Sequence, residues 1–117
     1  MSYVDAFVVP VITENLAEYR KLARKAGKVW KEHGALAYVE CAADDVEEGK
    51  RTSFPRSVKL KPHETVVFSY ITFTSRRDRN RINKLVMADP RIQELMTSKI
   101  FDTKRMFFGG FKPIVEI

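Results

Sequence analysis

Cysteine and histidine are scarce in this sequence, which limits the covalent and metal chemistry it can support. Cys41 is the only cysteine, so no intrachain disulfide can form, and a reducing cytoplasm is the expected location. With no histidine beside it, Cys41 is expected to be a buried, unreactive thiol. His33 is expected at a helix C-terminus, and no motif links it to His63, so we predict neither a metal nor another cofactor.

Long apolar runs are absent as well. No stretch approaches the roughly 20 apolar residues that a membrane-spanning helix needs, and the first residues lack the basic and apolar regions of an export signal. We therefore expect no membrane association. With 117 residues, of which 44% are hydrophobic and 31% charged, the chain is expected to fold as one globular domain spanning 1–117.

The most informative stretch that is present is the apolar run from Val66 to Phe73. Its residues are mostly β-branched or aromatic, which favours a strand. Successive side chains of a strand point to opposite faces, and here both faces carry large apolar groups. Segment 3–11 shares this property. The remaining predicted strands span 35–43 and 105–115.

Glycine and proline mark the irregular points of these strands. Pro10 cannot donate to a sheet ladder, so pairing is expected to weaken or bulge on one side of the first strand. Gly109 and Gly110 indicate a bulge or a close backbone approach in the last strand. Pro113 places that last strand at an edge of the sheet.

Two helices are expected between the strands. Thr13 is expected to cap the first, which runs over 14–33 with apolar residues at spacings of three and four and ends at Gly34. Ser75 is expected to cap the second helix, and Asp89 to cap its restart. The second helix begins with an arginine-rich turn, which is unusual because cations are slightly unfavourable at a helix N-terminus.

The order strand, helix, strand, strand, helix, strand predicts an α+β fold of the ferredoxin-like βαββαβ type. In this topology the first and third strands lie in the middle of an antiparallel sheet, and both helices cover one of its faces. The two segments that are apolar on both faces, 3–11 and 65–73, are those two central strands. Pattern and topology therefore predict the same architecture.

The second face of the sheet has no predicted cover. A large open apolar face is unusual for a monomer, so we expect a two-fold homodimer with sheet face against sheet face. The alternative is that the long connection 44–64 folds back over this face as a lid. Residues 57–61 within that connection are expected to form a short strand.

Several motifs in the chain are familiar when taken together. They are Tyr3-Val4-Asp5-x-Phe7-Val8-Val9, His33-Gly34-Ala35-Leu36, Val39-Glu40-Cys41, Asp44-Asp45-Val46, Thr52-Ser53-Phe54-Pro55, Glu64-Thr65-Val66-Val67-Phe68-Ser69, Met87-Ala88-Asp89-Pro90-Arg91 and Phe101-Asp102-x-Lys104-Arg105-Met106 with Gly109-Gly110-Phe111. With them the chain resembles, over nearly its whole length, the YbaA-like family of short bacterial proteins of unknown function. The resemblance implies a dimeric α/β-barrel fold. It supplies no activity, so it implies no catalytic residue.

Polar side chains that face an apolar interior are the best candidates for a small-molecule pocket. On the strands they are Asp5, Tyr38, Glu40, Ser69, Tyr70 and Arg105, and on the long connection Ser53, Phe54 and Arg56 are expected to close the pocket. A buried carboxylate is costly unless it is paired, so Asp5 or Glu40 with Arg105 is alternatively a structural ion pair.

Three function classes stay open at this point. The leading one is a homodimeric small-molecule-binding or accessory protein, and the second is a cofactor-free enzyme of the barrel monooxygenase type, by analogy of fold alone. The third is nucleic-acid binding through basic helix faces, which the net charge of +6 permits. It is the least favoured, because RNA-binding sheets of this topology use exposed aromatic residues that the expected dimer would cover.

Overall fold

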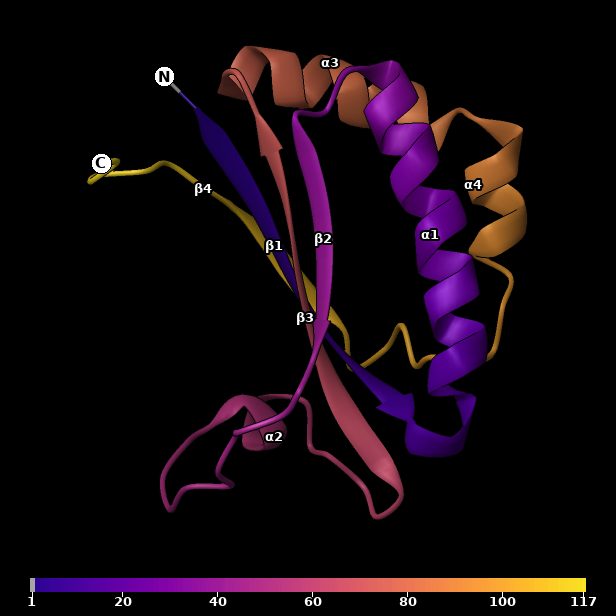
Figure 1. The fold of residues 1–117 in the computed structure, drawn as a ribbon, viewed down its shortest axis with the longest axis vertical. Helices are drawn as coiled ribbons and strands as arrows, with labels where there is room; N and C mark the ends of the chain where they lie inside the picture. Colours follow the sequence, from indigo (N-terminus) through magenta and orange to yellow (C-terminus); the bar gives the residue numbers. More distant parts are fainter. Residues whose placement is uncertain (1) are drawn as a thin grey trace.

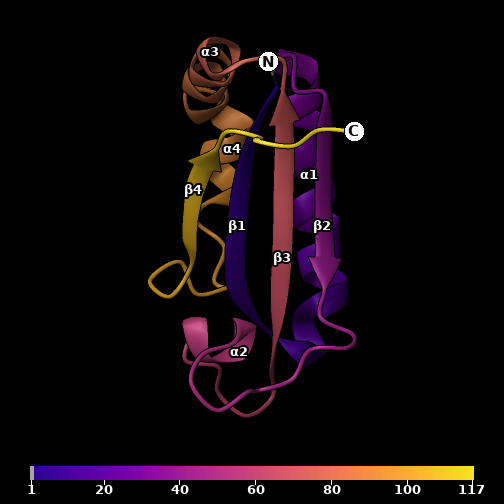
Figure 2. The same cartoon turned by 90° about the vertical axis from the view of Figure 1, so that its left-hand side faces the viewer.

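The chain folds around one four-stranded antiparallel sheet, in a computed structural model that describes residues 2–117 (Figure 1). The sheet has the strand order β2-β3-β1-β4, so the first and third strands are central, as predicted (Figure 2). This confirms the α+β, ferredoxin-like fold. The elements in chain order are β1 (Tyr3–Ile12), the 3-10 helix η1 (Thr13–Asn15), α1 (Leu16–His33), β2 (Ala37–Ala42), α2 (Phe54–Ser57), β3 (Glu64–Phe73), α3 (Arg76–Met87), α4 (Pro90–Leu95) and β4 (Phe107–Phe111).

Three of the expected helix ends are confirmed and one is wrong. Gly34 ends α1 in the left-handed conformation (φ 117°), Ser75 caps α3 by accepting the Asp78 N–H, and Asp89 caps α4. Thr13 makes no capping side-chain bond, because η1 precedes α1 there. Within residues 2–117, none of the helices is both long and apolar enough to cross a membrane.

The strand pairing confirms one of the two expected irregularities. β1 pairs with β3 without interruption from Tyr3 to Ile12, but its ladder with β4 ends at Val8, so pairing weakens on one side near Pro10, as predicted. From Phe107 to Phe111, β4 runs in register against β1. The bulge expected at Gly109 and Gly110 is therefore wrong, and the close backbone approach is right. A Cβ on Gly110 would lie 2.5 Å from the Tyr3 hydroxyl and 2.7 Å from Arg79 Nη2, so the ends of these two side chains lie close over the Gly110 backbone and would have to move to admit a larger residue.

Helices α1, α3 and α4 all cover the same face of the sheet, as predicted (Figure 1). Phe73 and Ile71 of β3 are buried there against Ile82 and Val86 of α3, and Val9 of β1 is buried against Tyr19 and Ala23 of α1. Full burial of such side chains contributes about 1.5–3 kcal/mol each. The buried members of these clusters are Val9, Val11, Tyr19, Ala23, Ala26, Val29, Trp30, Ala35, Val67, Ile71, Phe73, Ile82, Val86 and Ile92.

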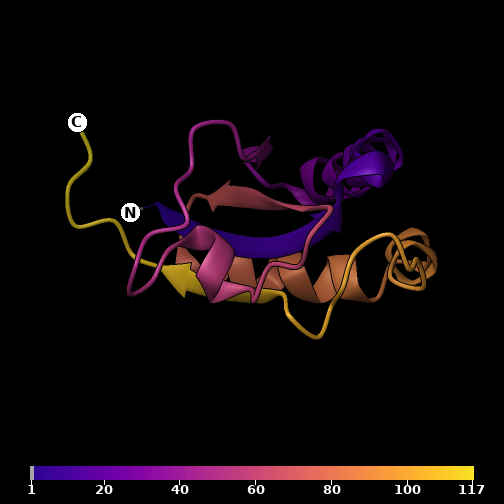
Figure 3. The same ribbon diagram turned by 90° about the horizontal axis from the view of Figure 1, so that it is seen from below.

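The opposite face is covered at one end only. Val58, from the long connection, is buried against Val8 and Val66, and α2 lies on this side of the sheet (Figure 3). The lid alternative is thus correct for this end of the face. The short strand expected over 57–61 is wrong, because α2 ends at Ser57 and a turn follows in which Lys59 takes φ 50°.

Candidate ligand-binding site

A cavity of about 350 Å³ lies between the helix-covered face of the sheet and helices α1, α3 and α4. Its walls are mostly apolar and include five methionine or aromatic side chains from the last third of the chain. Those five are Met87, Met96, Phe101, Met106 and Phe108. Two groups of polar side chains project into this apolar space, one centred on Asp5 and the other on Glu40.

The Asp5 group links strand β1 to helices α1 and α3. Asp5 is only 3% exposed, and its carboxylate accepts hydrogen bonds from Arg79 Nε at 2.9 Å and from Asn83 Nδ2 at 2.9 Å. Asn83 Oδ1 in turn accepts the indole N–H of Trp30 at 3.0 Å. The guanidinium of Arg79 also lies 5.2 Å from the centre of the Tyr3 ring. The buried carboxylate is therefore both paired and fully hydrogen-bonded, as burial requires.

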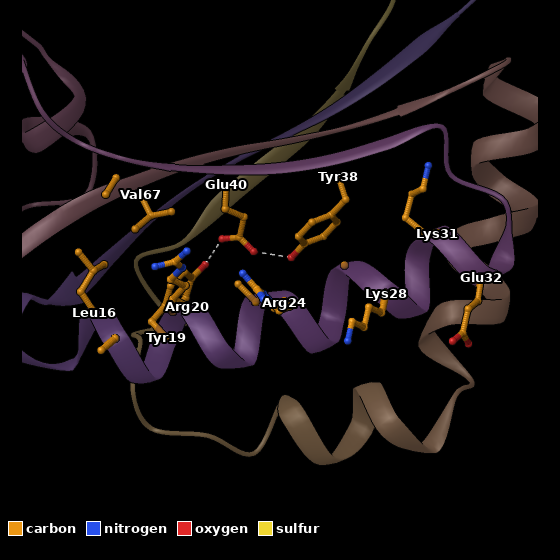
Figure 4. Close-up of a pocket in the computed structure, with 14 residues that line it drawn as sticks. Leu16, Tyr19, Arg20, Arg24, Lys28, Lys31, Glu32, Tyr38, Glu40 and Val67 are labelled. Carbon is orange, nitrogen blue, oxygen red and sulfur yellow. Dashed lines mark hydrogen bonds between the residues drawn. The ribbon is translucent and has the colours of Figure 1, made fainter.

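The Glu40 group lies between β2 and α1 (Figure 4). Both carboxylate oxygens of Glu40 accept hydrogen bonds, one from the Tyr19 hydroxyl and the other from the Tyr38 hydroxyl. Tyr38 can lie against the helix because residue 27 of α1 is glycine: a Cβ there would be 2.6 Å from the Tyr38 ring. This close approach holds the two hydroxyls on either side of one carboxylate.

The tyrosines of this group are strongly perturbed. Burial first, and the neighbouring Glu40 carboxylate second, raise the pKa of Tyr19 and of Tyr38 far above their ordinary value. Burial disfavours the phenolate, and a second negative charge beside Glu40 would be repelled. Both hydroxyls thus stay protonated at neutral pH and act as hydrogen-bond donors in the cavity wall.

Four of the nine candidate residues from the sequence meet in this cavity: Asp5, Tyr38, Glu40 and Ser69. The strand register explains why. Ser69 is opposite Glu40 on one side and Phe7 on the other, and Ile71 is likewise flanked by Tyr38 and Asp5. Residues directly opposite each other on antiparallel strands share a face, so all four side chains project toward the helices.

The other strand candidates lie elsewhere. Tyr70 projects from the opposite face, because it is one position out of phase with Ser69. Arg105 pairs with Glu64 at 2.6 Å and with Asp102 at 2.9 Å, so the proposed pairing of Asp5 or Glu40 with Arg105 is wrong. The bond from Arg105 also lowers the pKa of Glu64.

The three loop candidates are also remote from the cavity, because the long connection crosses the helix-free side of the sheet (Figure 3). Ser53 caps α2 by accepting the Arg56 N–H at 3.1 Å, and Phe54 packs edge-on against Phe68. Arg56 donates to the carbonyl oxygens of residues 48 and 49. These three side chains order the loop, and the expectation that they close the pocket is wrong.

Four residues of the two hydrogen-bonded groups in the cavity were not candidates on sequence grounds: Tyr19, Trp30, Arg79 and Asn83. Tyr19 and Trp30 belong to the apolar stripe of α1, where an aromatic residue ordinarily signals core. A signal did exist for Arg79, because an arginine in the first turns of a helix is unfavourable for the helix dipole. The structure explains that anomaly through the ion pair with Asp5.

The scarce residues fall outside the cavity. His33 ends α1, as expected, and hydrogen-bonds the Asp89 carboxylate at 3.1 Å. Cys41 is exposed, so the expectation of a buried thiol is wrong: its side of the edge strand β2 faces away from the helices. Among residues 2–117, no three His, Cys, Asp or Glu side chains gather as they would to hold a metal ion.

Comparison with known proteins places the chain in a family. Residues 2–103 match the model of a family described as "Protein of unknown function (DUF1428)". The chain belongs to this family. It is 47% identical over 116 residues to the uncharacterized protein YbaA of Escherichia coli K12, and the match covers 99% of each chain. The resemblance inferred from the sequence motifs is thereby confirmed.

Solved structures with low sequence identity share the fold. One is SnoaB, a cofactor-independent oxygenase from Streptomyces nogalater, with 12% identity, coverage of 99% of this chain and 96% of that one, and a TM-score of 0.63. Another is a dimeric ferredoxin-like protein from an uncultured marine organism, with 10% identity, full coverage of both chains and a TM-score of 0.61. At such identities the likeness establishes the fold alone.

Proposed function

We propose that the protein binds a small molecule in the cavity beneath its helices and works as a homodimer through the opposite sheet face. The observation that carries the first part is a cavity of about 350 Å³ in which two hydrogen-bonded polar groups converge within apolar walls. Ligand sites in proteins are typically concave and mostly apolar, with a few placed polar groups.

We also propose a cytoplasmic location, supported by the lone free cysteine and testable by cell fractionation.

The single tryptophan provides a direct test of the cavity. Trp30 lines it and donates its indole N–H to Asn83, so the indole signal in an NMR spectrum reports on the cavity interior. We expect the neutral aromatic probe N-phenyl-1-naphthylamine to shift this signal. Ala26→Leu, which fills the cavity from α1, should reduce the shift, whereas Ala17→Leu on the same helix but outside the cavity should not. An unmoved signal at saturating probe would contradict the proposal.

The homodimer is supported by aromatic side chains that are exposed on the helix-free face of the sheet. Phe68, Phe107 and Phe111 are exposed there, and the C-terminal residues extend from the sheet on the same side (Figures 1 and 2). Open apolar surface of this kind favours association by roughly 25 cal/mol per Å² buried, before entropic costs. A solved protein of the same fold is described as dimeric. Sedimentation equilibrium at micromolar concentration should report two chains per particle.

A second candidate function is a cofactor-free enzyme. It is favoured by one observation, the partly buried Glu40 carboxylate held between two tyrosine hydroxyls in the cavity wall, because a carboxylate in such a place can act as a proton acceptor. A protein of the same fold is a cofactor-independent oxygenase. Oxygen uptake with an electron-rich phenol, lost in Glu40→Gln, would support this candidate, and uptake no faster than in buffer would oppose it.

A further inference from the structure

The cavity adjoins a second, larger hollow on the far side of the Glu40 group. A groove of about 860 Å³ runs between α1 and the edge strand β2 (Figure 4). The groove and the cavity share four lining residues: Tyr19, Ala23, Tyr38 and Glu40. The two hollows are therefore neighbours, separated by the two tyrosines and the carboxylate that they hold.

The groove is strongly cationic. Arg20, Arg24, Lys28 and Lys31 of α1 line it, at spacings of four, four and three residues, so they lie along one side of the helix. Within residues 2–117, neither Arg20, Arg24 nor Lys28 forms an ion pair or a side-chain hydrogen bond. Lys31 donates to the Leu36 carbonyl at 2.7 Å.

The two carboxylates that border the groove do not neutralise these cations. Glu40 is occupied on both oxygens by tyrosine hydroxyls. Glu32 pairs instead with Arg91 of α4, at 2.8 Å. Unpaired positive charge thus faces the groove, while the cavity behind the tyrosines is apolar.

From this arrangement we infer that the ligand is an amphipathic organic anion. Its apolar body would occupy the cavity and its carboxylate, sulfonate or phosphate group would lie in the groove beside Arg20, Arg24 and Lys28. The inference rests on the proposed binding function and specifies its ligand class. A polyanion such as a nucleic acid would engage the cations but would leave the apolar cavity unfilled, so the combined features favour the amphipathic anion.

A matched pair of probes tests the charge requirement. The anion 8-anilinonaphthalene-1-sulfonate has the same aromatic body as N-phenyl-1-naphthylamine plus one sulfonate. Exposed ion pairs between the sulfonate and these groove cations should raise the affinity roughly tenfold. We therefore expect the anion to bind about tenfold more tightly than the neutral probe, both dissociation constants being read from the Trp30 indole signal. Salt should reduce this preference.

Two triple variants with equal charge change supply the control. Arg20→Gln, Arg24→Gln and Lys28→Gln together should abolish the preference for the anion and leave neutral-probe binding unchanged. The matched variant replaces Arg76, Arg77 and Lys84 of α3, which are exposed and line neither hollow, by glutamine. It should keep the full preference. Circular dichroism checks that both variants fold.

The possible results separate this inference from the binding function on which it rests. Equal affinity for the two probes, or an anion preference that survives in the groove variant, would overturn the amphipathic-anion inference while leaving the cavity as a binding site. Failure of both probes to move the Trp30 signal would overturn the binding function as well. A single-stranded oligonucleotide that binds through the groove cations, with no response of Trp30 to the sulfonate, would assign the groove to nucleic acid instead.

Discussion

The two faces of the sheet come from the same strands, yet they are completed differently. On the helix side, Asp5 and Glu40 are both hydrogen-bonded on each oxygen, and among residues 2–117 every buried side-chain nitrogen or oxygen has a partner. On the other side, α2 and Val58 cover one end, and Phe107 and Phe111 stay exposed. The first face is covered by helices of the same chain, whereas the second leaves apolar side chains exposed.

The largest expected effect comes from breaking the helix-side network. Asp5→Ala leaves Arg79 and Asn83 without their shared acceptor, and removing one partner of a buried ion pair costs about 3–5 kcal/mol. Urea unfolding at a fixed chain concentration should show a loss of about 3 kcal/mol. Glu18→Ala, which breaks an exposed pair with Lys21, should change stability by less than about 1 kcal/mol. Equal effects of the two substitutions would mean that the Asp5 network does not stabilise the fold.

The next largest effect is expected from a substitution on the helix-free face of the sheet. Phe111→Asp places a charge on the open apolar surface, and burying an unpaired charge is strongly unfavourable. We expect the dimer dissociation constant to rise at least about 100-fold, which corresponds to about 2.7 kcal/mol. Light scattering after gel filtration gives the mass, and Leu85→Asp on the exposed side of α3 is the control. An unchanged mass in Phe111→Asp would place any subunit contact elsewhere.

A smaller effect is expected at the contact between helix α1 and Tyr38 on the helix-covered face. Gly27→Ala should destabilise the protein by about 1 kcal/mol, although alanine is the better helix former by a similar amount, because its Cβ would press on the Tyr38 ring. In a Tyr38→Ala background the same substitution should stabilise the protein instead. Thermal unfolding of the wild type, the two single variants and the double variant measures this reversal of sign. Gly27→Ala being stabilising in both backgrounds would show that Tyr38 does not pack on α1.

The smallest effect is a pH dependence. The pKa values of Tyr19 and Tyr38 are raised in the folded protein, so above pH 10 the unfolded chain loses these protons first, and stability should fall as pH rises. Their contribution is fully present below the unfolded pKa of about 10. Tyr19→Phe should flatten the alkaline limb of the stability curve. An equally steep limb in this variant would mean that Tyr19 ionises normally.

Alternation and element order predicted the fold, but the contacts between elements were harder to predict. The faces of β1 and β3 follow from their side-chain period, and with the strand order they bring Asp5, Glu40 and Ser69 together. The partner of Asp5 depends on how α3 is rotated over the sheet, which local pattern does not fix. Arg105, which was the expected ion-pair partner of Asp5 or Glu40, is paired with Glu64 instead.

The packing of the long connection 44–64 was also only partly predictable from the sequence. Its apolar residues predicted that some part would pack, but neither its side nor its extent could be predicted, because loop paths depend on tertiary contacts. Val58 packs on Val8 and Val66, while Phe54 packs against Phe68 and stays half exposed. The lid and the dimer were posed as alternatives, and the structure shows a partial lid beside an open remainder.

Native mass spectrometry of freshly purified protein most directly tests the proposal that one face of the sheet holds a ligand and the other forms a homodimer. It reports the number of chains and any retained small molecule in one spectrum. We expect a particle of twice the 13.5 kDa chain mass that carries additional mass for a ligand in each chain. A folded single chain at micromolar concentration, with no retained mass and no mass gained from added probe, would contradict this proposal.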